Sequence, residues 1–176
     1  RFLKKNGFQN LKGCDLSEEQ VELAQKDGFQ VVLQDAQSFV ESTENWDALV
    51  AIDVLEHLTK DEAVTLLKQI RGRINAGGKV VIRVPNADAA VGGSYLWSDV
   101  THELFLNAAS ARQLFQSCGF QDVVVLGSYS MARGWKRFLS MPLRAIIELK
   151  IKLTHLAYGA GSSGKIWTPN LVIVAK

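Results

Sequence analysis

Cysteine, proline and long apolar runs are all scarce in this sequence of 176 residues. Its two cysteines, Cys14 and Cys118, lie too far apart in the chain to form a metal-binding Cys motif. We therefore expect no disulfide framework, no metal site and a reducing, cytoplasmic environment. No segment approaches the roughly 18 consecutive apolar residues that cross a bilayer, which argues against a membrane-spanning protein.

A large excess of one charge is also lacking. Twenty Lys and Arg against eighteen Asp and Glu leave a net charge of +2, which provides no general attraction to nucleic acid. A composition of 47% hydrophobic and 22% charged residues is typical of a folded domain with a sizeable core. We expect one domain over residues 1–176.

The positive charge that does exist is concentrated in residues 131–165. Pro142 is expected to interrupt the amphipathic helical pattern of residues 131–158. Two interpretations stay open: a helix pair packed on the core with a solvated cationic face, or an interfacial lid over an apolar or lipid-linked substrate that touches a membrane peripherally. The only acid in this segment is Glu148, and its cations are Arg133, Lys136, Arg137, Arg144, Lys150, Lys152 and Lys165.

Segments with strand and helix patterns alternate along the chain. Ser17, Thr59 and Asn107 are expected to cap three helices, since each precedes an amphipathic stretch. Such alternation predicts a Rossmann-like α/β fold: a doubly wound, mostly parallel sheet with helices on both faces and a helical insertion before the last strand. The expected strands are residues 11–16, 29–33, 46–52, 79–84, 123–126 and 171–175.

Polar side chains follow several of these strands where a ligand would bind. Asp15, Asp35, Asp53 and Asn86 all come at or just after a predicted strand end. Ligands of doubly wound sheets bind beyond the carboxyl ends of the strands. A ribose diol could donate to such a carboxylate, although an exposed aspartate before a helix is equally common.

Three stretches resemble the class I S-adenosylmethionine-dependent methyltransferases. They are residues 13–20 (GCDLSEEQ), 46–58 (WDALVAIDVLEHL) and 77–86 (GGKVVIRVPN). The similarity is greatest to the small-molecule group that contains ubiquinone-type and sugar O-methyltransferases. It covers about residues 7–126 and 167–176.

The resemblance implies S-adenosyl-L-methionine as the cofactor and assigns residues to its nucleoside. Asp15, with Leu16 beside it, would bind the ribose hydroxyls. Asp35 would accept a hydrogen bond from the adenine amino group, and Ala36 would lie against the ring.

At the methionine and sulfonium end of the cofactor, the resemblance implies Ile52 and Asp53. The family's glycine-rich first-strand motif, which holds the methionine part, should lie upstream of Phe2. We therefore expect the domain to be truncated at its N-terminus, with no signal peptide before Arg1.

The segment of residues 87–106 follows a strand end and is expected to overhang the acceptor side of the site. His102 within it is the candidate catalytic base, oriented by Asp99 or Glu103, and His57 is expected to support its own loop. The alternative for His102 is a structural bond between the loop and the sheet.

The leading functional hypothesis is methyl transfer to a hydroxyl oxygen of a small molecule, such as a glycan or lipid-linked precursor, without nucleic acid. One alternative is a catalytically silent binding domain that retained the fold. Another is a nicotinamide-dependent oxidoreductase, which predicts G-x-G-x-x-G after a strand. Residues 159–164 match those letters, but no strand is predicted before them.

Overall fold

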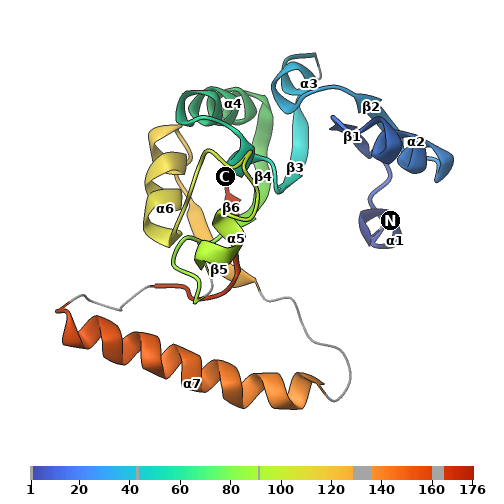
Figure 1. The fold of residues 1–176 in the computed structure, drawn as a ribbon. Helices are drawn as coiled ribbons and strands as arrows, with labels where there is room; N and C mark the ends of the chain where they lie inside the picture. Colours follow the sequence, from blue (N-terminus) through green and yellow to red (C-terminus); the bar gives the residue numbers. More distant parts are fainter. Residues whose placement is uncertain (1, 43, 91, 129–135, 160–164) are drawn as a thin grey trace. The chain divides into compact units, whose positions relative to one another are not determined.

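The computed structural model describes residues 2–42, 44–90, 92–128, 136–159 and 165–176 (Figure 1). The chain forms two compact units, Arg1–Glu44 and Asn45–Lys176. That both belong to one domain stays a prediction. Residues 129–135 and 160–164, which include part of the basic segment and most of the G-x-G-x-x-G match at residues 159–164, lie outside the described residues.

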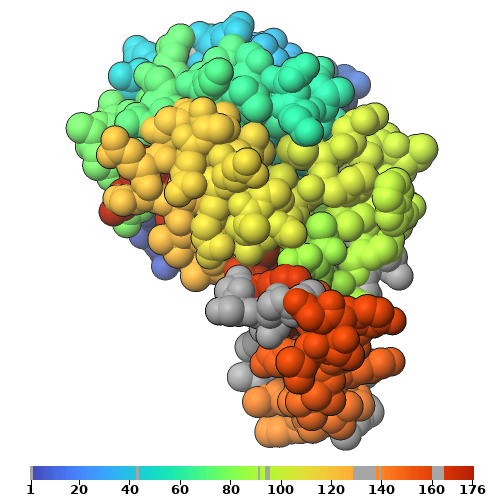
Figure 2. Space-filling model, turned by 90° about the vertical axis from the view of Figure 1, so that its left-hand side faces the viewer, coloured from blue at the N-terminus to red at the C-terminus, as the bar shows by residue number. Residues whose placement is uncertain are grey.

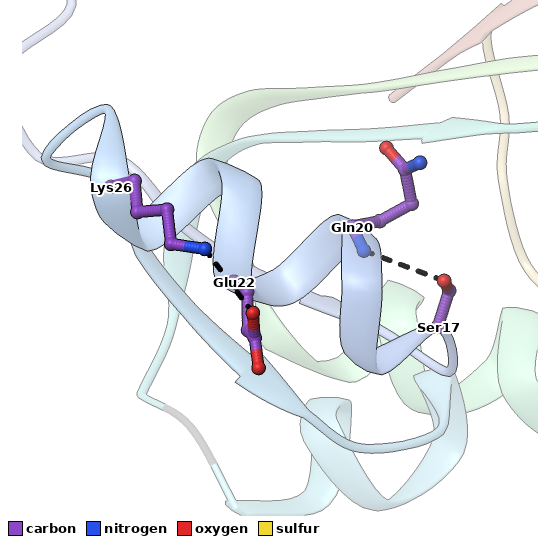
Figure 3. Close-up of polar contacts among 4 residues, drawn as sticks. All are labelled: Ser17, Gln20, Glu22 and Lys26. Carbon is purple, nitrogen blue, oxygen red and sulfur yellow. Dashed lines mark hydrogen bonds and ion pairs between the residues drawn. The ribbon is translucent and has the colours of Figure 1, made fainter.

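The first unit is built around a βαβ crossover. Strands β1 and β2 pair in parallel, because the intervening helix carries the chain back to the starting edge. Ser17 caps this helix as expected: its Oγ accepts a 3.4 Å hydrogen bond from the Gln20 N–H, and Glu22 and Lys26 form an i,i+4 ion pair (Figure 3). The elements are α1 (Phe2–Lys5), β1 (Lys12–Asp15), α2 (Glu18–Lys26), β2 (Gln30–Leu33) and α3 (Ala36–Ser42).

The second unit contains a four-stranded sheet in the order β3-β4-β6-β5. β3 is parallel to β4, and the last strand, β6, is antiparallel to both of its neighbours. The mostly parallel α/β fold is therefore confirmed, with β6 as the exception. The elements are β3 (Trp46–Ile52), the 3-10 helix η1 (Leu55–His57), α4 (Lys60–Arg73), β4 (Ile74–Pro85), α5 (Gly92–Leu96), α6 (Ala108–Ser117), β5 (Val123–Ser128), α7 (Lys136–Ala157) and β6 (Asn170–Ala175).

The core of the second unit lies between this sheet and helices α4 and α6. Alternate residues of β4 and β6 are fully buried, as are Leu67 of α4 and Phe115 of α6. The two helices lie next to each other on the face shown in Figure 2. The Arg71 guanidinium of α4 donates to the Gly119 carbonyl after α6 at 3.1 Å. On β3, Val50 and Ile52 are about half exposed.

Helix α4 begins where the sequence predicts. Thr59 and Glu62 form a reciprocal capping box, in which the Glu62 carboxylate accepts from the Thr59 N–H at 2.8 Å. Asn107 caps α6 in the same manner with Ser110. Both boxes satisfy N–H groups that a helix start leaves unpaired, so local sequence is enough to set these boundaries.

Strand β4 begins at Ile74, five residues before the predicted start. Its pairing with β3 is irregular there: Trp46 pairs with Ile74, whereas Ala48 pairs with Lys79. Gly77 takes a φ of 80° in this irregular part, a conformation that side chains disfavour. The glycines therefore permit a distorted extension of the strand instead of only ending the helix.

Replacing Gly78 by alanine is expected to lower the free energy of unfolding by about 1–3 kcal/mol. A Cβ there would lie 2.9 Å from the Asp47 carbonyl oxygen and 3.0 Å from that of Asn75, both backbone atoms that cannot rotate away. The matched control is Gly72→Ala in α4, where a Cβ meets nothing within 4 Å and should stabilise by about 0.5–1 kcal/mol. Urea unfolding measures both, and equal stability of the two variants would contradict the packing.

Helix α7 is a single helix, although Pro142 was expected to interrupt it. Proline removes the hydrogen bond to the Phe138 carbonyl, four residues earlier, and its ring crowds that carbonyl. Residues 143–157, however, are rich in helix-forming Leu, Lys and Ala. Of the helices in the described parts of the chain, none is long and apolar enough to cross a membrane.

Candidate active site

In the first unit, two carboxylates stand at the ends of adjacent parallel strands. Asp15 is the last residue of β1, and Asp35 follows β2 by two residues. One Asp15 oxygen, Oδ1, accepts the Ser17 N–H at 2.8 Å. Asp35 Oδ1 accepts the Ser38 N–H at 2.8 Å, and the bonds from Ser38 hold the pKa of Asp35 below its usual value.

The charges of both carboxylates affect the pKa of the neighbouring Cys14 thiol. Its partial burial, followed by the charges of Asp15 and Asp35, raises the pKa of the thiol to about 11. The thiol therefore stays protonated at neutral pH, and its nucleophilic form is suppressed. The same shift indicates that both carboxylate charges act on one place at this strand edge.

These residues fit a nucleoside. Asp15 and Asp35 are exposed acceptors, and Asp15 Oδ2 has no hydrogen-bond partner among the described residues. A ribose diol and an exocyclic amino group are donors that such carboxylates can bind. Leu16 is exposed and Ala36 half-buried, so both leave surface near the two carboxylates for a ligand.

In the second unit, Asp53 directly follows β3 (Trp46–Ile52) and takes a left-handed conformation. Its φ of 54° is the only positive value among the described non-glycine residues, and such conformations are uncommon outside glycine and cluster at functional sites. Arg83 of the neighbouring strand β4 binds it twice, with Nε 3.0 Å from Oδ1 and a second ion pair to Oδ2. The hydrogen bonds to Asp53 raise the pKa of the Arg83 guanidinium.

Arg83 was not predicted as a site residue from the sequence. Ile52 pairs with Arg83 in the parallel register, which places the guanidinium beside the end of β3. With both oxygens bound to Arg83, the Asp53 carboxylate is positioned by the sheet. Ile52 presents a half-exposed apolar side chain next to it.

The segment of residues 87–106 is fastened at its start to the residues that precede β6, and near its end to η1. At its start, buried Asn86 donates to the carbonyls of Ile166 and Thr168 at 2.7 and 2.8 Å. Near its end, the Glu56 carbonyl accepts N–H groups from Glu103 and Leu104 at 2.7 and 3.1 Å. His102 is thereby held over η1.

The protonation of His102 follows from its partner. Nδ1 lies 3.1 Å from the Leu96 carbonyl oxygen, and because a carbonyl can only accept, Nδ1 carries the hydrogen. In the neutral ring, Nε2 then carries the lone pair. Asp99 or Glu103 was expected to orient the His102 ring. The side chain of neither residue forms a hydrogen bond to that ring. The Asp99 carboxylate instead binds the Thr101 N–H and hydroxyl at 2.9 and 2.7 Å.

His57 is fixed by the same chain of bonds. The Thr101 hydroxyl gives its hydrogen to Asp99, so His57 Nδ1, 2.9 Å from Thr101 Oγ1, is the donor to that oxygen. The bond ties η1 to the 87–106 segment, which agrees with the expected supporting role of His57. Its ring meets that of His102 edge-on, with centroids 4.8 Å apart.

Glu56 is the buried charge of the site, and its importance was not recognised from the sequence. It is 2% exposed, and its Oε2 has no hydrogen-bond partner among the described residues. Burial raises its pKa to about 7, Asp53 adds to the rise, and His102 and Arg83 oppose it. Its charge at neutral pH therefore depends on the state of its neighbours.

Glu56, His57 and His102 could also hold a divalent cation. Each offers one ligand atom, and these atoms lie within 4.8 Å of one another. Histidines whose Nδ1 is bonded to protein groups are typical metal ligands through Nε2. The sequence suggested no metal site because His102 is 45 residues from His57 and joins it only through the fold.

The sequence matches the profile of a methyltransferase domain family over residues 1–125. The chain belongs to this family. Membership confirms the expected enzyme class and S-adenosyl-L-methionine as the cofactor. No curated protein matches the sequence.

Solved methyltransferase structures share the fold. An S-adenosylmethionine-dependent methyltransferase from Archaeoglobus fulgidus is 19% identical, with a TM-score of 0.71 over 99% of this chain and 79% of that one. One from Clostridium acetobutylicum is 10% identical, with a TM-score of 0.62 over 97% and 76%. Magnesium protoporphyrin IX methyltransferase from Synechocystis, with S-adenosylhomocysteine bound, is 13% identical, with a TM-score of 0.54 over 93% and 62%.

Proposed function

We propose that this methyltransferase domain methylates a hydroxyl oxygen of a small molecule, with His102 as the base that removes the hydroxyl proton. The observation that carries the proposal is the bond from His102 Nδ1 to the Leu96 carbonyl. It leaves the Nε2 lone pair as the proton acceptor, on a segment that is fastened to η1 and to the residues before β6.

The chemistry requires little covalent assistance from the protein. S-adenosyl-L-methionine supplies an already electrophilic methyl group when bound, so alignment and proton removal are the remaining tasks. Asp15 and Asp35 would hold the nucleoside, with Leu16 and Ala36 beside it. Ile52 and Asp53 would line the methionine end.

Glu56 would assist His102 electrostatically. When His102 takes a proton its ring becomes positive, and an ionised Glu56 nearby stabilises that charge. The mutual influence of the two groups is already expressed in the pKa of Glu56, which the charge of His102 lowers against the effect of burial. His57 and Thr101 keep the segment in place.

The proposed acceptor is a glycan or lipid-linked precursor, which would bind on the side of the site that the 87–106 segment is expected to overhang. Nucleic acid is not proposed, because the net charge is only +2. The silent binding domain is the less favoured alternative, since the family match and the arrangement around His102 both point to catalysis.

The test is transfer of a ¹³C-methyl group from labelled S-adenosylmethionine to a panel of hydroxylated glycans and isoprenoid phosphates. We expect a methoxy carbon signal in the product NMR spectrum and a rate unaffected by EDTA. An N-methyl or C-methyl product would contradict the oxygen acceptor. Loss of the rate in EDTA, restored by a divalent cation, would instead assign Glu56, His57 and His102 to a metal.

Replacing Asp15 by alanine should weaken S-adenosylhomocysteine binding by about 1.5–3 kcal/mol, or roughly 10–150-fold, because charged hydrogen bonds to the ribose are lost. Calorimetric titration measures the change. Glu22→Ala is the control, since it removes one carboxylate from the same unit but breaks only the surface pair with Lys26. An unchanged affinity in the Asp15 variant would refute its role.

A further inference from the structure

Helix α7 exposes an apolar face between Phe138 and Leu156. Its 22 residues span about 33 Å. Six large apolar side chains at helical spacing are each at least 56% exposed, and they are Phe138, Leu143, Ile146, Leu149, Leu153 and Leu156. A patch of this extent on a protein surface marks an interaction site.

The polar side of α7 is the side that contacts the rest of its own unit. His155 lies opposite the apolar face by helical spacing, and its Nδ1 is 3.3 Å from Lys165 Nζ. Its ring also contacts that of Trp167, with centroids 5.1 Å apart, just before β6. Arg144, Glu148 and Ile151, on the same side, are half-buried. The apolar face is thus left without an intramolecular partner among the described residues.

The positive charge of α7 favours an anionic lipid surface over a second copy of the helix as its partner. Its sequence carries Lys136, Arg137, Arg144, Lys150 and Lys152 against Glu148 alone, a net charge of +4. A second copy of the helix would bring like charges together, which is unfavourable. A surface of anionic phospholipid attracts the same cations by about 1 kcal/mol each.

We propose that α7 is an interfacial helix that lies in the surface of a membrane containing anionic phospholipid, with its apolar face inserted between the lipids. A helix with Leu, Ile and Phe on one face and Lys and Arg beside them has the composition that binds this way. Because it is not apolar enough to cross the bilayer, it lies on the membrane. This placement would bring the methyltransferase close to lipid-linked molecules.

The first experiment is flotation of the protein with lipid vesicles. We expect binding to phosphatidylcholine vesicles with about a quarter phosphatidylglycerol, and at least roughly 10-fold weaker binding to phosphatidylcholine alone. Lys150→Gln with Lys152→Gln should weaken binding to the anionic vesicles by roughly 30-fold. Absence of binding to anionic vesicles would overturn the proposal.

Two neutral double variants test which face inserts. Ile146→Asn with Leu153→Asn removes two apolar-face side chains, and should weaken vesicle binding by about 100-fold. The matched control is Ile147→Asn with Ile151→Asn, the same kind of change on the other side of the helix, which should change binding less than about 3-fold. Circular dichroism checks that both variants stay folded.

Two further outcomes would overturn the proposal. Equal losses in the two double variants would show that the apolar face is not what the lipid contacts. Sedimentation equilibrium without lipid gives the second: a dimer that Ile146→Asn with Leu153→Asn dissociates would make another copy of the chain the partner of α7. We expect a monomer under those conditions.

Discussion

Replacing His102 by asparagine is expected to lower kcat by about 10²–10⁴-fold, the usual contribution of a positioned general base. Asparagine can still donate to the Leu96 carbonyl from nearly the position of Nδ1, so the segment should keep its conformation. What it lacks is the Nε2 lone pair. The affinity for S-adenosylhomocysteine should change less than about 3-fold, because the nucleoside contacts are proposed to lie on other residues.

Both quantities are needed to interpret this variant. Methyl transfer under saturating cofactor gives kcat, and calorimetry gives the affinity. His155→Asn is the control, since this histidine lies on α7 and contacts Lys165 and Trp167. A variant of His102 with kcat within about 3-fold of wild type would end its assignment as the base. A joint collapse of rate and cofactor affinity would make the residue structural.

Replacing Glu56 by glutamine is expected to stabilise the protein at alkaline pH and much less at acidic pH. Folding raises the pKa of this carboxyl from its ordinary 4.5 to about 7, so the folded state holds its proton more tightly than the unfolded state. The wild type is therefore most stable, as far as Glu56 is concerned, below pH 4.5 and loses stability until about pH 7. Glutamine cannot ionise and avoids this loss.

The size of the stability difference follows from the rise in the pKa of Glu56 on folding. Between pH 5 and pH 8, the advantage of Glu56→Gln over wild type in free energy of unfolding should grow by about 2–3 kcal/mol. Asp53, His102 and Arg83 surround Glu56 and are present in both proteins, so the difference largely isolates its ionisation.

Urea unfolding at several pH values tests this prediction. Glu103→Gln is the control, because this glutamate is exposed on the segment that covers η1, and its effect should stay within about 0.5 kcal/mol at every pH. An advantage of Glu56→Gln that stays constant with pH, or grows towards acid, would contradict a raised pKa.

The parts of the fold that the sequence predicted are those that depend on short-range patterns. Ser17, Thr59 and Asn107 each cap the expected helix, because an N-cap needs only its own side chain and the next three residues. The strand at residues 46–52 was placed correctly by its run of apolar residues.

The site features that could not be predicted from the sequence depend on contacts between residues that are distant in the chain. Arg83 binds Asp53 across 30 residues, and Thr101 reaches His57 across 44. Both pairs exist only because the sheet and the 87–106 segment bring them together. The burial of Glu56 is of the same kind, since a glutamate on a short helical turn is ordinarily exposed.

Local patterns also gave two wrong expectations that the fold corrects. Pro142 was expected to end a helix that continues past it, since the residues that follow favour helix strongly enough to tolerate one lost bond. Gly77 and Gly78 were expected to precede β4 but lie within it. In each case the local rule is valid, and longer-range pairing or propensity outweighs it.

The most direct test of the account is calorimetric titration of the protein with S-adenosylhomocysteine, with NAD as the control ligand. The account predicts one site with micromolar affinity for S-adenosylhomocysteine and no heat of binding with NAD. Absence of S-adenosylhomocysteine binding to folded protein would contradict the cofactor site at Asp15 and Asp35, and would favour a silent binding domain. Binding of NAD instead would contradict the enzyme class itself.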